Sequence, residues 1–231
     1  GFLLDKKNIQ NKKSFLKGDW WVQDFSSFLP LHNFHEIDKN SKILDTCAAP
    51  GGKSFQILSK KLNIILNDKS RTRTEILKSN LNRLKFNTKI LNEDFTKFET
   101  TEKFDIIIID APCSAIGTVR KNPEILFKNR SPNFSELTSL QENMLKKAAI
   151  LLNKNGFIIY MTCSFLKIET IDQVNNFLKK HNDFMLSEFK INEDKNNYTK
   201  LIKNNLMITV PNMILNYNID GYFAAYLKKI K

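Results

Sequence analysis

The sequence predicts an α/β fold in which helices cover both faces of a mostly parallel sheet. Three observations support this prediction. Apolar, strand-like runs alternate with amphipathic helical segments through residues 41–181. Two of the runs, 103–110 and 156–162, contain four and five consecutive apolar residues, Ile106–Ile109 and Phe157–Met161, as expected for parallel strands that are buried on both faces. A tight glycine turn follows the first run and leads into a helix, which is the usual start of a parallel strand–helix–strand unit.

The individual elements follow from local patterns in the chain. Predicted strands are short, rich in Ile, Leu or Phe, and mostly end in Asp; they cover 41–45, 63–68, 88–94, 103–110 and 156–162. Predicted helices repeat apolar residues at three- and four-residue spacing or begin at polar capping residues; they cover a short segment capped by Asp24, then 50–62, 72–85, 135–152 and 169–181.

Two of these helices lead to predictions about individual side chains. The helix over 72–85 is expected to bury one apolar face, formed by Ile76, Leu77, Leu81 and Leu84. The helix over 169–181 is expected to hold Glu169 and Asp172 in its first turn, where the helix dipole favours acidic groups.

The C-terminal part of the chain breaks the alternation. Residues 190–219 are polar and rich in Asn, and the apolar run 221–230 is expected to return as a strand of a C-terminal antiparallel hairpin. No linker divides the chain into two large domains, and 231 residues are enough for one α/β domain with its own core. We therefore expect residues 1–35 to form a lead-in with a small appendage and residues 36–231 to form the main domain.

The composition limits the class of protein. No apolar run approaches the roughly 20 residues that span a bilayer, and no signal peptide is visible, so we expect no membrane partner. Three cysteines without disulfide spacing fit a reducing compartment, and we expect a cytoplasmic monomer. Scattered histidines and the lack of CxxC predict no metal site. The net charge of +12 favours nucleic acid, although an AT-rich coding bias explains Lys-rich composition equally well.

The glycine turn lies in the run ILDTCAAPGGKS, residues 43–54, and contains Pro50, Gly51 and Gly52. Glycines at this position let backbone N–H groups approach a ligand at the start of a helix. The spacing does not match the GxGxxG pattern of dinucleotide sites. A P-loop is also disfavoured, because Cys47 stands where its first glycine belongs.

Acidic residues end successive predicted strands, namely Asp45, Asp68, Asp94 and Asp110. Asp68 follows the turn by roughly 20 residues, the position at which a carboxylate typically accepts hydrogen bonds from ribose hydroxyls. A single Asp at a strand end commonly only starts a turn. The set of acids together with the glycine turn indicates a nucleoside cofactor across the sheet edge. Because no phosphate fingerprint is present, S-adenosylmethionine is the natural candidate.

Two cysteines follow the two most apolar strands, Cys113 in IIIIDAPCSA and Cys163 in FIIYMTCSF. If these strands are neighbours in a parallel sheet, both thiols lie at the edge where ligands bind in open α/β folds. Each cysteine alone is most simply a small buried hydrophobe, and a disulfide between them is a competing account. Beside a methyl donor, the pair indicates covalent chemistry, because C5 of a pyrimidine becomes a good nucleophile only after a thiolate adds to C6.

Asp110 stands three residues before Cys113 and is placed to protonate the ring as the thiolate adds. A second thiol can then assist the elimination that releases the product. The spacing does not decide which of Cys113 and Cys163 attacks. Cys47 lies inside the glycine turn, where its backbone can matter more than its sulfur.

Five motif strings occur in a characteristic order along almost the whole chain: VQDFSS (22–27), DTCAAPGGKS (45–54), DAPCSAIGTVRKNPE (110–124), TCS (162–164) and DGYFAAYL (220–227). Through these strings the chain resembles the NOL1/NOP2/Sun family of RNA cytosine-C5 methyltransferases. The similarity is greatest to the bacterial Sun/Fmu (RsmB-like) type, which methylates a cytosine of 16S ribosomal RNA.

This resemblance implies a Rossmann-like class I methyltransferase fold, S-adenosylmethionine as cofactor and ribosomal RNA as partner. It also implies that Cys163 is the nucleophile, that Cys113 serves product release, and that Asp110 lies by the methyl group and the target base. The implied cofactor contacts are the turn residues Cys47, Ala48, Ala49, Pro50, Gly51, Gly52 and Lys53, with Asp68 at the ribose, Asp94 at the adenine and Asp110 near the methyl group.

The chain departs from the family pattern in two places. After TCS, the stretch FLKIET keeps Glu169 but lacks the Pro and Asn that are usual there. The bacterial type usually carries an N-terminal helical RNA-binding domain, which residues 1–40 are not expected to supply. A cytosine of a tRNA or another RNA is therefore an alternative target.

Two other functions remain as alternatives. A ribosome-assembly RNA-binding protein could keep the fold without turnover, although the intact thiols, Asp110 and glycine turn speak against it. An amino-group methyltransferase would favour an Asn/Asp-Pro-Pro-aromatic string at the fourth strand, where this chain has Asp110-Ala111-Pro112-Cys113.

Overall fold

The computed structural model describes residues 8–127, 131–191, 198–211 and 218–231. The strands are β1 (Ile43–Asp45), β2 (Ile64–Asn67), β3 (Ile90–Leu91), β4 (Phe104–Asp110), β5 (Leu152–Thr162), β6 (Phe184–Leu186), β7 (Ile202–Lys203), β8 (Leu206–Thr209) and β9 (Tyr222–Lys229). The α-helices are α1 (Lys13–Leu16), α2 (Phe25–His32), α3 (Gly52–Ser59), α4 (Arg71–Leu84), α5 (Phe134–Leu151) and α6 (Ile171–Lys180). Short 3-10 turns include η2 (Phe95–Lys97), η3 (Ile116–Thr118), η4 (Pro123–Phe127) and η5 (Lys167–Glu169).

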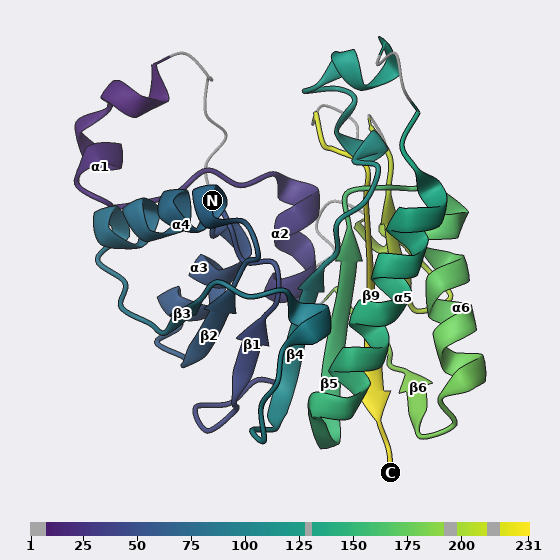
Figure 1. The fold of residues 1–231 in the computed structure, drawn as a ribbon. Coiled ribbons are helices and arrows are strands. Elements are labelled where there is room, and N and C mark those ends of the chain that lie inside the picture. The colour runs from purple at the N-terminus through teal and green to yellow at the C-terminus, as the bar shows by residue number, and fades with distance from the viewer. Residues whose placement is uncertain (1–7, 128–130, 192–197, 212–217) are drawn as a thin grey trace.

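The strands form one sheet in the order β3-β2-β1-β4-β5-β9-β8-β7, with β6 beside the C-terminal half of β9 (Figure 1). Strands β1 to β5 pair in parallel. Strand β9 runs antiparallel to both β5 and β8. The predicted fold class is therefore confirmed, including the C-terminal antiparallel hairpin. Parts of the polar stretch predicted before that hairpin, 192–197 and 212–217, lie outside the described residues.

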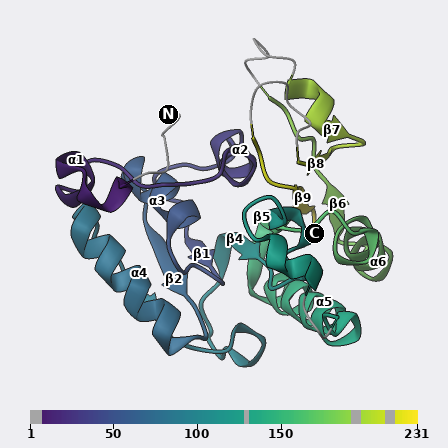
Figure 2. The ribbon, with the colours of Figure 1, turned by 90° about the horizontal axis from the view of Figure 1, so that it is seen from above.

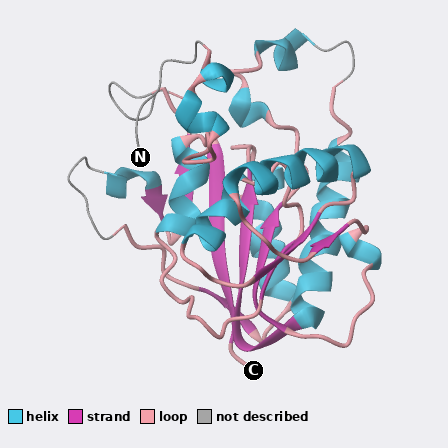
Figure 3. Ribbon diagram, turned by 90° about the vertical axis from the view of Figure 1, so that its left-hand side faces the viewer, coloured by secondary structure: helices cyan, strands magenta, loops and turns pink. Residues whose placement is uncertain are grey.

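Helices cover both faces of the sheet, as predicted. Seen from above, α2 and α3 lie on one side of the strands and α5 and α6 on the other (Figure 2), and the strands occupy the middle layer (Figure 3). In β4, Ile106 and Ile108 contribute to the core beneath α2, α3 and α4. Ile107 and Ile109 contribute to the core beneath α5 and α6. This double burial explains why the four consecutive residues from Ile106 to Ile109 are all apolar.

Two side-chain predictions were wrong. Ile76 is 51% exposed, whereas Leu77 and its helical neighbours at spacings of four and seven are buried. Successive helical residues are rotated by about 100°, so Ile76 leaves the face that Leu77 defines. Glu169 is not in the first turn of α6, because it belongs to η5 and the helix begins at Ile171. Asp172 does lie in that first turn.

Other boundaries differ by a few residues. Strand β3 covers only Ile90–Leu91, so Asp94 follows the strand instead of ending it. Strand β5 begins at Leu152, directly after α5. Asp24 caps α2 as predicted, because its side chain accepts a hydrogen bond from the Ser26 N–H. Among the described residues, no helix is long and apolar enough to cross a membrane.

Candidate active site

The two thiols predicted to share a sheet edge do meet there. Cys113 follows β4, Cys163 follows β5, and these strands are parallel neighbours. The two sulfur atoms lie 3.3 Å apart, and both cysteines are free thiols. The disulfide considered from the sequence is therefore not formed, since a disulfide needs about 2.05 Å.

Backbone hydrogen bonds fix the segment after β4 against the end of β5. The Ala111 N–H donates to the Met161 carbonyl at 2.8 Å, and the Gly117 N–H donates to the Cys163 carbonyl at 3.0 Å. The Gly221 N–H, just before β9, donates to the Gly117 carbonyl at 2.7 Å. A Cβ atom on Gly117 would lie 2.0 Å from the Gly221 carbonyl oxygen, so this close approach requires glycine.

The surroundings distinguish the two thiols. The hydrogen bond from Cys113 lowers the pKa of Cys163, and the nearby Lys53 ammonium acts in the same direction against burial and Asp110. The same hydrogen bond, followed by burial, raises the pKa of Cys113, and Glu169 adds to that effect. With the Lys53 ammonium nearby, the thiolate is favoured on Cys163, and in that state the Cys113 thiol is the donor of the hydrogen bond between them.

Asp110 ends β4 beside the thiols, and two donors hold its carboxylate. Lys53 of α3 places its Nζ 2.7 Å from Oδ2, and the Tyr222 hydroxyl of β9 donates to Oδ1 at 2.8 Å. Burial opposes the charge of Lys53, but the charge and hydrogen bond of Asp110 raise the pKa of Lys53. Sequence reasoning missed Tyr222, although it lies in the quoted string DGYFAAYL.

The glycine turn is built around a buried acid. Asp45 is 1% exposed, accepts from the Cys47 N–H at 3.2 Å and accepts from the Ser54 hydroxyl at 2.6 Å. Burial raises the pKa of Asp45 to about 6. Gly51 has a φ of 117°, and a Cβ there would lie 2.0 Å from the Phe55 ring, so only glycine fits. Asp45 therefore stabilises the conformation of the turn through these two hydrogen bonds.

A pocket beside this turn brings together Cys47, Asp68 and Asp94 from the predicted cofactor set. The other lining residues are Thr46, Lys69, Ser70, Arg73, Glu93, Phe95, Thr96, Pro112, Leu140 and Met144. The residues Ala48–Lys53 and Asp110 are not among its lining; Lys53 and Asp110 instead pair with each other close to Cys163. Phe95 and the neighbouring apolar side chains, which the sequence did not single out, give the pocket a surface suited to a flat base.

Backbone N–H groups and neighbouring side chains hold the two pocket acids, and Arg73 also lies 3.4 Å from the Asp68 carboxylate. Asp68, 2% exposed, accepts from the Ala49 N–H at 3.2 Å and the Ser70 N–H at 3.0 Å. Asp94 accepts from the Thr96 hydroxyl at 2.7 Å and the Thr96 N–H at 3.0 Å, and these bonds lower the pKa of Asp94. Both carboxylates therefore lie in fixed orientations where ribose hydroxyls or a base amino group can donate to them. Burial, with the charge of Asp45 next, raises the pKa of the Cys47 thiol to about 12.

Glu169 anchors the loop that contains Cys113. Its buried carboxylate accepts from the Ser114 N–H at 2.8 Å and from the Ser114 hydroxyl at 2.6 Å. The Gln141 amide lies 3.4 Å from the same carboxylate, and the Tyr160 hydroxyl donates to the Glu169 carbonyl at 2.8 Å. Sequence reasoning missed this role and placed Glu169 in a helix start; the one signal for it was that Glu169 is the acid retained after TCS.

A group of four charged side chains joins three of the motif strings. Lys121 Nζ lies 2.6 Å from Asp24 and 2.5 Å from Asp220. Arg120 lies 2.9 Å from Asp220 and 3.5 Å from Asp24. This group ties the loop after Cys113 to the start of α2 and to the residues before β9.

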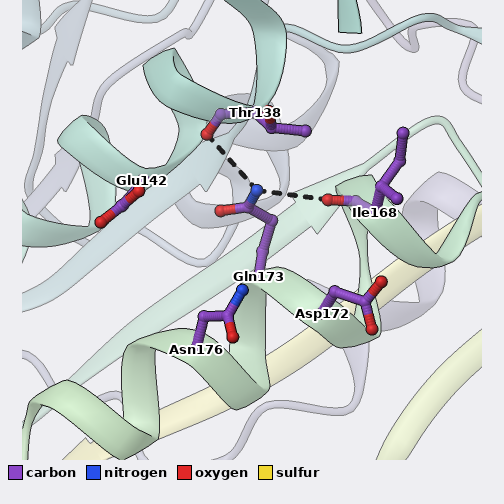
Figure 4. A pocket seen from close by; sticks show the side chains of 6 residues that line it. All are labelled: Thr138, Glu142, Ile168, Asp172, Gln173 and Asn176. Atoms are coloured by element: carbon purple, nitrogen blue, oxygen red, sulfur yellow. Dashed lines mark hydrogen bonds between the residues drawn. The ribbon is translucent and has the colours of Figure 1, made fainter. Parts of the chain in front are cut away.

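A second pocket lies between α5 and α6, on the outer side of the helices. Its lining residues are Thr138, Glu142, Ile168, Asp172, Gln173 and Asn176 (Figure 4). The Gln173 amide donates to the carbonyls of Thr138 and Ile168, which joins the two helices. Among the described residues, no group of three or more His, Cys, Asp or Glu could hold a metal ion.

The sheet order and the helices on both faces define a Rossmann-like class I methyltransferase fold. A family model described as 16S rRNA methyltransferase RsmB/F matches residues 33–228. The chain therefore belongs to the RsmB/F family of methyltransferases, in agreement with the NOL1/NOP2/Sun resemblance.

Characterised relatives agree with this assignment. Ribosomal RNA small subunit methyltransferase B of Photorhabdus laumondii is 35% identical over 184 residues, covering 78% of this chain and 43% of that protein. The 25S rRNA (cytosine-C(5))-methyltransferase nop2 of Schizosaccharomyces pombe is 32% identical over 230 residues, covering 94% and 38%. The chain thus spans about two fifths of the length of these relatives.

A solved structure shows the same fold. NSun6 from Pyrococcus horikoshii, crystallised with the S-adenosylmethionine analogue SFG, superposes with a TM-score of 0.82 at 28% identity. The match covers 96% of this chain and 56% of that one.

Proposed function

We propose that this chain is the catalytic part of an enzyme that methylates C5 of a cytosine in RNA, with 16S ribosomal RNA as the substrate and S-adenosylmethionine as the donor. The observation that supports it most strongly is the free thiol pair, 3.3 Å apart, beside the Asp110–Lys53 ion pair. We also propose that the main domain, residues 36–231, acts as a cytoplasmic monomer. The names of the relatives support the RNA substrate.

The pocket beside the turn fits S-adenosylmethionine. Asp68 and Asp94 present fixed carboxylates to the ribose and the adenine, and the apolar lining accepts a flat base. No phosphate cradle is needed, which agrees with a turn that matches neither phosphate-binding pattern. When bound, the cofactor supplies an electrophilic methyl group.

We propose that Cys163 attacks C6 of the cytosine. A bond forms between the Cys163 sulfur and C6, and the displaced π electrons move through the ring to N3, which takes a proton from the Asp110–Lys53 pair, so that the resulting enamine is nucleophilic at C5. C5 takes the methyl group, the C5 proton then leaves to water, and N3 returns its proton to the Asp110–Lys53 pair. The Cys163 thiolate is expelled and the double bond returns. Cys113 lies within hydrogen-bonding distance of Cys163, so it is placed to assist this release.

The test is covalent trapping with RNA that contains 5-fluorocytosine, which cannot lose a proton from C5. The full chain and S-adenosylmethionine should give an adduct at Cys163, identified by mass spectrometry. Cys163→Ala should give none, whereas Cys47→Ala, the control, should keep adduct formation once cofactor is saturating. Methyl transfer without any adduct at Cys163 would overturn the nucleophile assignment.

The choice of RNA is tested separately. Equal amounts of 16S ribosomal RNA, small ribosomal subunits and tRNA are offered with labelled donor, and the methylated cytosine is mapped. Preferential labelling of tRNA would replace the ribosomal substrate with the alternative target. An absence of methyl transfer to every RNA, with RNA binding retained, would favour the non-catalytic RNA-binding alternative.

A further inference from the structure

We propose that Tyr222 is a positioning residue for this methyl transfer, because its hydroxyl fixes the Asp110 carboxylate beside the thiols. This inference rests on the proposed function. The Tyr222 hydroxyl donates to Oδ1 of Asp110 at 2.8 Å, while Lys53 contacts Oδ2 at 2.7 Å. The two donors therefore hold different oxygens of the same carboxylate.

The position of Tyr222 is fixed by its surroundings. Its side chain is 2% exposed, and it begins β9, where it pairs with Thr209 of β8. The preceding Gly221 is hydrogen-bonded to Gly117 in the loop after Cys113. Its ring also lies under the Lys53 ammonium, with 5.3 Å from Nζ to the ring centroid. Tyr222 thus has little freedom to leave the carboxylate.

The hydroxyl remains a donor over the working pH range. Burial, followed by the charge and hydrogen bond of Asp110, raises the pKa of Tyr222 well above its usual value. The other titratable groups near this carboxylate are Lys53 of α3, Asp45 at the end of β1, Cys47 in the glycine turn, and the thiols Cys113 and Cys163. Tyr222 contributes a neutral donor in this charged group.

Two fixed donors define the direction in which Asp110 can act. An ionised carboxylate has about four acceptor positions. Lys53 and Tyr222 each occupy one, on opposite oxygens, so the carboxyl group cannot rotate without breaking a short hydrogen bond. The remaining acceptor positions stay available to a base held near the thiols. With Lys53 alone, the carboxylate could pivot about one contact, and the fraction of correctly oriented complexes would fall.

The test is Tyr222→Phe, which removes only the hydroxyl and keeps the ring beside Lys53. The matched control is Tyr226→Phe in the same strand, because the Tyr226 hydroxyl is also buried but donates to the Pro30 carbonyl at 2.6 Å. We expect Tyr222→Phe to lower kcat and the rate of adduct formation with 5-fluorocytosine RNA by about 10- to 100-fold, the range for a hydrogen bond to a charged group. KM for RNA and the affinity for S-adenosylmethionine should change less than twofold.

A double variant locates the effect. If Tyr222 acts through Asp110, Tyr222→Phe should cause almost no further loss of single-turnover rate in an Asp110→Asn background. Equal rates for wild type and Tyr222→Phe, equal losses in Tyr226→Phe, or full additivity with Asp110→Asn would each overturn the inference while the proposed function stands. A wild-type chain that transfers no methyl group would instead overturn the proposed function, and this inference with it.

Discussion

Replacing Glu169 by Ala is expected to destabilise the loop that holds Cys113, and the contacts of this side chain set the size of the effect. Glu169 is 0% exposed, and its two carboxylate oxygens accept from the N–H and the hydroxyl of Ser114 at 2.8 Å and 2.6 Å. A hydrogen bond to a charged group contributes about 1.5–3 kcal/mol. Loss of both bonds should therefore lower the free energy of unfolding by about 3–5 kcal/mol.

Urea-induced unfolding measures this difference. Glu169→Gln keeps the shape and one acceptor, so it should lose about half as much. Asp172→Ala is the control, because Asp172 is only partly buried in the first turn of α6 and should cost about 0.3–1 kcal/mol through the helix dipole. If Glu169→Ala cost no more than Asp172→Ala, Glu169 would be a charge near a helix start, and the anchoring role would be refuted.

Three further changes test other parts of the site. Cys113→Ala should trap the protein on ordinary RNA as a stable complex in denaturing gels, because release is impaired; unhindered turnover would contradict the release role. Because burial raises the pKa of Asp45 to about 6 from 3.8, the folded state keeps a proton that the unfolded chain loses. The free energy of unfolding should thus fall by about 2.4 kcal/mol as the pH rises from 4 to 7. Asp45→Asn should remove that part of the pH dependence, and equal slopes in the variant and the wild type would rule it out. Gly117→Ala would place a Cβ 2.0 Å from the Gly221 carbonyl oxygen and should lower the melting temperature by several degrees. Gly52→Ala is the control and should not lower it, because a Cβ on Gly52 would meet its nearest atom only at 3.7 Å. Equal melting temperatures for the two variants would refute this prediction.

Local patterns were sufficient for the layers and for the thiol pair. The apolar run of β4 and the run around β5 are long enough to mark buried strands, and parallel pairing then brings Cys113 and Cys163 to one edge. The spacing of apolar residues predicted a buried face of four residues on α4, and three of them are buried. The fourth, Ile76, directly precedes Leu77 and is therefore rotated by about 100° away from that face. A short strand such as β3 carries too few residues for its ends to be read from alternation.

The contacts that the sequence could not predict join residues far apart in the chain. Tyr222 and Asp110 are 112 residues apart, and Ser114 and Glu169 are 55 apart. Nothing in the local sequence shows that a hydroxyl in an apolar strand will meet a carboxylate across the sheet. Only the antiparallel entry of β9 beside β5 brings them together.

The late position of β9 in the chain affects how the protein is made on the ribosome. Strands β1 to β5 are complete by residue 162, and domains generally begin to fold while synthesis continues. Until residues 220–222 have emerged, however, Asp110 lacks its hydroxyl donor, and Arg120 and Lys121 lack Asp220. A nascent chain can therefore assemble most of its sheet before the contacts around Asp110 are complete. The geometry around Asp110 and the thiols should therefore become complete only after residues 220–222 have been synthesised.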